Sequence, residues 1–70
     1  MNRNNDMQHV YPAYMSDAVA KLMAGQMVGC TGGMVANDFE ARLRAEGIPY
    51  RRRQVWAGPG VTLWHVFQAE

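Results

Sequence analysis

The sequence predicts a single small α+β domain: two helices packed on a small antiparallel sheet with a C-terminal β-hairpin, in the order α-(β)-α-β-β. Three observations favour this class. Apolar residues recur at helical spacing twice, once before residue 25 and once between residues 34 and 46. Two strand-like runs follow, with the turn residues AGPG between them. The length of 70 residues, of which 49% are hydrophobic, suits one globular domain.

Residues 1–14 open the chain with a polar, Asn-rich stretch, which predicts a flexible N-terminal arm ahead of a domain at 15–70. The stretch lacks the apolar core of a signal peptide, and no run approaches the roughly 18 apolar residues of a membrane span. The single cysteine, Cys30, excludes an intramolecular disulfide and favours a reducing compartment. We therefore expect a cytoplasmic protein that does not contact a membrane, with Cys30 as a buried thiol.

The first helix is expected to begin near Ser16, because a Ser-Asp pair supplies a cap oxygen and a negative charge in the first turn. Its apolar face comprises Val19, Leu22 and Met23, and Gly25 ends it. Residues 26–30 can form one short strand. Thr31 is the expected cap of the second helix.

The second helix, at 34–46, has the clearest pattern. Its apolar face is formed by residues four apart: Val35, Phe39 and Leu43. Two ion pairs at the same spacing are expected on its exposed side: Asp38–Arg42 and Glu40–Arg44. Gly47 occupies the position of a left-handed terminator, Ile48 can then contact the last turn, and Pro49 prevents continuation.

The closing hairpin is expected to pair residues 50–56 with residues 61–67. The second of these strands is apolar on both faces, with Val61, Leu63 and Phe67 on one and Trp64 and Val66 on the other. Such a strand is covered on both sides or shows one side to a partner. His65 alternates with the apolar residues, which indicates a packed, hydrogen-bonded histidine.

Three consecutive arginines begin the hairpin. Strand alternation places Arg51 and Arg53 on one face, and Arg52 on the other with Tyr50 and Gln54. Arg51 and Arg53, with Trp56 at the strand end, are suited to holding phosphates and stacking on a base. Two other interpretations stay open: a solvated edge strand protected from aggregation by charge, and pairing with an acidic protein surface.

The stretch ARLRAEGIPY, residues 41–50, resembles the junction between recognition helix and wing in small phage-type winged-helix DNA-binding domains. The resemblance covers residues 34–67. It implies a helix at 34–46 that enters the major groove and a hairpin loop at 57–60 that touches the backbone or minor groove. Only residues 26–33 are available for the middle helix of that family, so the expected fold is a truncated, winged-helix-like one.

These patterns lead to a small, non-enzymatic DNA-binding regulator of phage or mobile-element type as the first hypothesis, with duplex DNA as its partner. Its expected contact residues are Asn37, Arg42, Arg44, Arg51, Arg52 and Arg53. The alternative is a phage-encoded protein-binding inhibitor or adaptor, anti-CRISPR-like, which recognises an acidic host protein. That surface would comprise Tyr50, Trp56 and Trp64 with the arginines.

A structural subunit of a larger assembly is a third interpretation, and homodimerisation stays open because a chain this short has a small core. No arrangement of residues suits catalysis, so we expect no enzyme activity and no cofactor. Cys30, His9 and His65 lack zinc-ligand spacing, which predicts no metal site.

Overall fold

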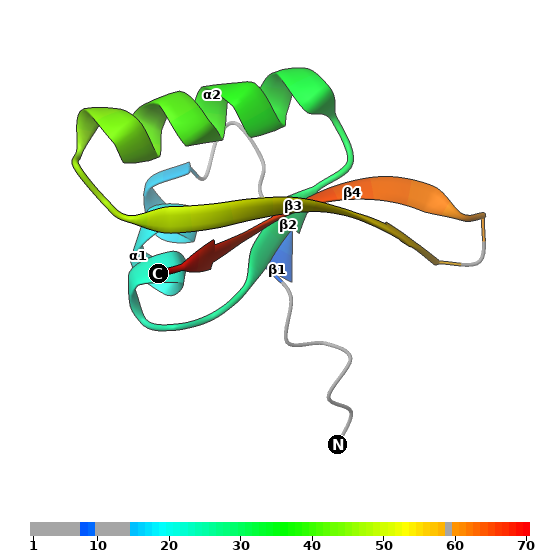
Figure 1. Ribbon diagram of the computed structural model, residues 1–70, viewed down its shortest axis with the longest axis horizontal. Coiled ribbons are helices and arrows are strands. Elements are labelled where there is room, and N and C mark those ends of the chain that lie inside the picture. Colours follow the sequence, from blue (N-terminus) through cyan, green and yellow to red (C-terminus); the bar gives the residue numbers. More distant parts are fainter. Residues whose placement is uncertain (1–7, 10–14, 59) are drawn as a thin grey trace.

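A computed structural model describes residues 8–9, 15–58 and 60–70 of the protein (Figure 1). In chain order the elements are β1 (Gln8–His9), α1 (Met15–Met23), β2 (Val28–Cys30), α2 (Gly33–Ala45), β3 (Tyr50–Ala57) and β4 (Thr62–Ala69). The four-stranded sheet has the order β1-β2-β4-β3. Only the β1–β2 pair is parallel. The α+β class and the C-terminal hairpin are therefore confirmed.

Both helices cover the same face of the sheet. Val28 lies opposite Phe67 and Cys30 opposite His65, so these four side chains point to one side. The core on that side joins both helices to β2 and β4 and comprises Ala18, Val19, Leu22, Val28, Cys30, Ala36, Phe39, Leu43 and Phe67. At its centre the Phe39 ring meets the Phe67 ring edge to face, with centroids 5.0 Å apart.

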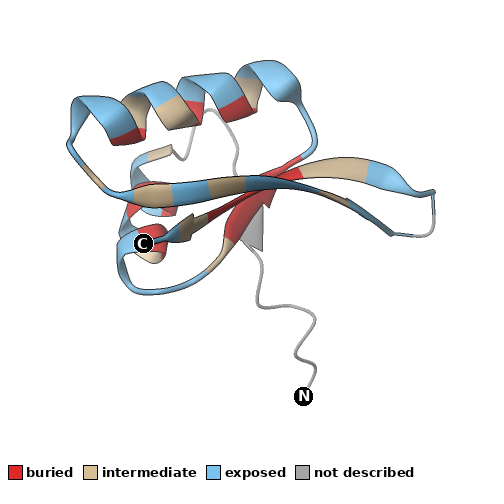
Figure 2. Ribbon diagram, viewed as in Figure 1, coloured by how far each residue is buried: buried red, intermediate tan, exposed pale blue. Residues whose placement is uncertain are grey.

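The opposite side of the sheet is covered by neither of the two helices, and we call it the helix-free face. By register it carries Gly29, Arg51, Arg53, Val55, Trp64, Val66 and Gln68. Val66 is buried on this face, whereas Arg51 and Arg53 are exposed. Figure 2 shows buried residues on the side of α2 that faces the sheet, on α1 and on the central strands, with exposed residues at the projecting end of the hairpin. Among the described residues, the β3 side of the helix-free face and that end of the hairpin are thus the most exposed parts of the sheet.

The end of α2 confirms the predicted stop. The Ile48 N–H donates to the Leu43 carbonyl at 3.0 Å, and the Gly47 N–H donates to the Arg44 carbonyl at 3.1 Å. These two bonds form a Schellman motif, which requires the left-handed backbone that Gly47 adopts with a φ of 69°. Because Pro49 follows directly, the chain leaves the helix and enters β3 at a fixed point.

Three sequence expectations about element ends are wrong. The residue that caps α2 is Gly32, and no side chain makes a capping hydrogen bond, so Thr31 is not the cap. Met23 is exposed at the end of α1, because Ala18, Val19 and Leu22 already fill the buried side of that short helix. Val61 lies before β4 in the turn, exposed, with a φ of 49°.

The predicted N-terminal arm falls largely outside the described residues, since 1–7 and 10–14 are not among them. Gln8 and His9, which were also assigned to the arm, instead pair in parallel with Val28 and Gly29. The predicted strand at 26–30 is confirmed in its second half as β2. Within the described ranges, no helix is long and apolar enough to cross a membrane.

Candidate binding surface

The structure divides the predicted nucleic-acid-binding residues between the two sides of the sheet. Asn37, Arg42, Arg44 and Arg52 lie on α2 or on the face of β3 beneath it. Arg51 and Arg53 lie on the helix-free face. One flat DNA-binding surface therefore does not contain all six. Each group has its own partners, and these decide how much positive charge it presents.

Arg52 joins β3 to α2. Its Nη1 donates to Glu40 Oε1 at 2.6 Å and to Asn37 Oδ1 at 3.1 Å, and its Nη2 lies 3.2 Å from His65 Nδ1. The guanidinium carbon also lies 5.4 Å from the centre of the Phe67 ring. Both side chains of the Arg52–Glu40 pair are 21% exposed. Arg52 is thus an internal bridge, and Asn37 is one of its acceptors.

Glu40 accepts hydrogen bonds from three side chains on the helix side of the sheet, whereas the sequence predicted only Arg44 as its partner. The Tyr50 hydroxyl donates to Glu40 Oε2, and Arg44 contacts the same oxygen at 3.4 Å. The Tyr50 hydrogen bond, followed by the Arg52 contacts, lowers the pKa of Glu40 below its ordinary value. Arg44 Nε also donates to the Tyr50 oxygen at 2.9 Å, and the pKa of Arg44 is raised by this contact first. Tyr50 therefore belongs to this network.

Arg42 has a different partner from the predicted one. Its Nε donates to Glu46 Oε2 at 2.6 Å and its Nη2 to the Ser16 hydroxyl at 3.0 Å. The expected Asp38–Arg42 pair is therefore wrong, because Glu46, one turn later, takes the guanidinium. With Glu40 and Glu46 paired to arginines, the α2 side presents little uncompensated positive charge.

Arg51 and Arg53 present their charge more openly. Arg51 Nη2 is 4.0 Å from Glu70 Oε2, the limit of an ion pair, and its side chain is 67% exposed. Arg53 extends over the helix-free face, where its Nη2 contacts the Met27 sulfur at 3.6 Å. A thioether is a weak acceptor and does not compensate a charge. The helix-free face is therefore the more cationic of the two sides.

The end of the hairpin carries apolar side chains on both faces. Trp56 lies opposite Leu63 on the helix side, and Val55 lies opposite Trp64 on the helix-free face. Trp56 is 66% exposed, whereas Trp64 is half-buried. The expectation that Trp56 works beside Arg51 and Arg53 needs correction, because strand alternation places Trp56 on the other face. Trp64 is the tryptophan that shares their side.

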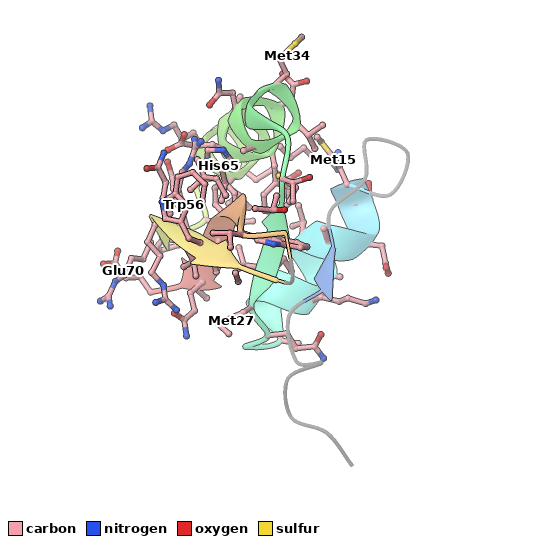
Figure 3. All side chains as sticks on the ribbon, turned by 90° about the vertical axis from the view of Figure 1, so that its right-hand side faces the viewer. Met15, Met27, Met34, Trp56, His65 and Glu70 are labelled. Atoms are coloured by element: carbon pink, nitrogen blue, oxygen red, sulfur yellow. The ribbon has the colours of Figure 1, made fainter. Side chains whose placement is uncertain are left out.

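His65 and Cys30 lie under α2 (Figure 3 shows His65 on the side of the sheet that faces this helix). His65 is 8% exposed with its Nδ1 against Arg52, which confirms a packed, hydrogen-bonded histidine. A guanidinium only donates, so His65 Nδ1 is the acceptor in this hydrogen bond. Cys30 is a buried free thiol, as expected, and burial raises its pKa against the smaller opposite effects of the Gly32 backbone and Arg52.

Comparison of the chain with protein-family models, with curated proteins and with solved structures found no match.

Proposed function

We propose that the protein is a non-enzymatic binding module that recognises another protein through its β3–β4 hairpin. The observation that carries this proposal is Trp56, a large side chain left 66% exposed near the end of β3. Tryptophan and arginine are the residue types that dominate binding energy at protein interfaces. Trp56 lies three residues after Arg53, so an apolar anchor and a cationic group occur on one short strand.

The charge distribution supports a partner with an acidic surface. Within the described ranges, Arg51 has a carboxylate only at the 4.0 Å limit, that of Glu70, and Arg53 has none, whereas the arginines of α2 are paired with Glu40 and Glu46. An acidic partner gains most by facing the uncompensated pair. This proposal corresponds to the inhibitor or adaptor hypothesis, and we place its action in the cytoplasm, where Cys30 stays a thiol.

The test is affinity capture with the full chain, comparing Trp56→Ala with Met34→Ala. Met34 is the matched control, because it is 81% exposed and lies on α2, away from Trp56 (Figure 3). Trp56→Ala is expected to abolish capture of the partner while the circular dichroism melting curve stays close to that of the original chain. Equal capture by both variants contradicts the proposal.

Binding of duplex DNA is the second candidate, favoured by the exposure of Arg51 and Arg53 on one face. In it those two residues contact phosphates, and the winged-helix resemblance and phage-type origin stay predictions. A labelled random duplex, titrated at low salt and again at physiological salt with anisotropy as the signal, tests it. Binding that fades steeply with salt and loses about one unit of salt slope for each arginine removed supports this candidate. Absence of binding at low salt removes it.

A further inference from the structure

The outer edge of β3 is the longest unpaired strand edge among the described residues. β3 is last in the order β1-β2-β4-β3, so only its inner side pairs with a neighbour. Its eight residues pair one to one with β4, from Tyr50 opposite Ala69 to Ala57 opposite Thr62. Because N–H and C=O groups alternate between the two edges of a strand, half of those in β3 point outward. Such an edge is a template for another strand.

This edge lacks most of the devices that prevent strand addition. Protected edges are short, bulged, interrupted by proline or lined with charge. The segment YRRRQVWA contains neither proline nor glycine, and its register with β4 has no extra residue. Charge is therefore its only protection. Charge of one sign repels cationic strands and attracts anionic ones, so it selects a partner as well as guarding the edge.

Strand alternation decides which charges an added strand meets. Arg52 points to the helix side and is bound to Glu40. Arg51 and Arg53 point to the helix-free face, followed along the strand by Val55. Side chains directly opposite each other on paired strands lie about 4.5–5.5 Å apart. Every second residue of an added strand therefore faces Arg51, Arg53 and Val55 in turn, which favours two carboxylates and then an apolar group.

We propose that the outer edge of β3 binds an extended, acidic segment of the partner protein as an additional strand, with carboxylates at two alternate positions facing Arg51 and Arg53. The inference rests on the proposed function and specifies its mode. Main-chain hydrogen bonds supply the pairing, and the two ion pairs set the register. Trp56, further along on the opposite face, then contacts the same strand or the body of the partner.

A second copy of this chain fits the edge less well than an acidic strand does. Twofold pairing of two β3 strands places Arg51 and Arg53 of both copies on the same face of one continuous sheet. Like charges directly opposite each other on neighbouring strands are destabilising, and among the residues that the structure describes the carboxylate nearest to these arginines is that of Glu70, 4.0 Å from Arg51. Charge complementarity therefore selects the acidic segment.

The first experiment titrates the ¹⁵N-labelled full chain with an alternating peptide, Val-Thr-Glu-Thr-Glu-Thr-Val, whose two carboxylates share one face of a strand with a valine on either side. The control peptide, Val-Thr-Thr-Glu-Glu-Thr-Val, has the same residues with the two glutamates adjacent, so its carboxylates point to opposite faces. We expect the alternating peptide to bind more tightly and to slow hydrogen exchange at alternate amides of β3. Equal affinity for the two peptides, or binding that leaves exchange in β3 unchanged, overturns the inference.

Two double variants separate the effect of charge at the edge of β3 from the effect of the net charge of the chain. Arg51→Gln with Arg53→Gln is expected to weaken binding of the alternating peptide by about tenfold, the sum of two cross-strand ion pairs. Arg42→Gln with Arg44→Gln removes the same charge from α2, and its affinity is expected to stay within about twofold of the original, since additivity holds for independent sites. Equal weakening in both pairs refutes the strand model.

Two further outcomes distinguish failure of this inference from failure of the proposed function on which it rests. Protection of β3 amides without peptide, rising with protein concentration, shows that a second copy occupies the edge and overturns the inference. A partner that is captured in a Trp56-dependent way but leaves β3 exchange unchanged also overturns it, while the proposed function stands. If Trp56→Ala captures the partner normally, the proposed function fails on its own test.

Discussion

Replacing Arg52 with alanine is the most informative single perturbation of this fold. The substitution removes the donor that binds Glu40 at 2.6 Å and Asn37 at 3.1 Å, and it leaves His65 Nδ1 without this contact. Hydrogen bonds to charged groups are each worth about 1.5–3 kcal/mol, and removing one partner of a half-buried ion pair also leaves the other charge uncompensated. Both side chains are 21% exposed, so solvent reduces the effect. We therefore expect a loss of about 2 kcal/mol in the free energy of unfolding.

Thermal and urea unfolding, followed by circular dichroism, measure this loss. For a domain of this size about 2 kcal/mol corresponds to a fall in Tm of about 8–16 °C. Arg51→Ala is the matched control on the same strand, and its cost should stay below about 0.5 kcal/mol because its ion pair is exposed and long. A double-mutant cycle with Glu40→Gln should give a coupling energy of about 1 kcal/mol or more. Arg52→Ala and Arg51→Ala variants of equal stability, or a coupling energy near zero, would refute the bridging role.

Three other outcomes follow from the same structure. The pKa of Glu40 is lowered in the folded protein from its ordinary value of 4.5, so the stabilisation by the Glu40 carboxylate is complete above pH 4.5 and is lost as the pH falls through the lower folded pKa. The free energies of urea unfolding of Glu40→Gln and of the original chain should therefore converge on acidification. A difference between them that does not change with pH contradicts this. Val61→Asn should raise the free energy of unfolding by about 1 kcal/mol, because asparagine tolerates the left-handed backbone that strains a β-branched residue. An unchanged Tm in a thermal melt counts against backbone strain at Val61. Cys30 should react with a thiol reagent far more slowly in the folded chain than in urea, because it is buried and its pKa is raised; equal rates are inconsistent with that burial.

Local signals were sufficient to predict most of the fold. The spacing of Phe39 and Leu43, the glycine at 47 and the turn residues between the strands each act within a few residues, and the structure confirms what they predicted. The errors arose where the sequence offered more than one ion-pair partner or more than one capping residue. Arg42 had acidic residues four positions away on both sides and binds the later one, Glu46. The capping position went to Gly32, where the backbone is extended, and no side chain makes the capping hydrogen bond.

The candidate site was less predictable because its contacts join distant parts of the chain. Strand alternation correctly separated Arg52 from Arg51 and Arg53, but it does not reveal that Glu40, twelve residues earlier, lies above Arg52. That contact depends on how α2 crosses the sheet, which is set by the packing of Phe39 on Phe67. A run of three arginines therefore looks uniform in the sequence, although in the fold its members have different partners.

The alternation of β3 gives this arginine run two separable roles. The middle residue, Arg52, has its charge compensated by Glu40 and holds α2 on the sheet. With the described part of the chain, the outer two, Arg51 and Arg53, make long or weak contacts, and in the proposed function they bind an acidic partner. A shift of β3 by one residue against β4 would exchange these faces, exposing Arg52 and turning the outer pair toward the core. The Arg52–Glu40 bridge therefore fixes the register in which the other two arginines face outward, and the stability of the fold and the orientation of the binding surface depend on the same contact.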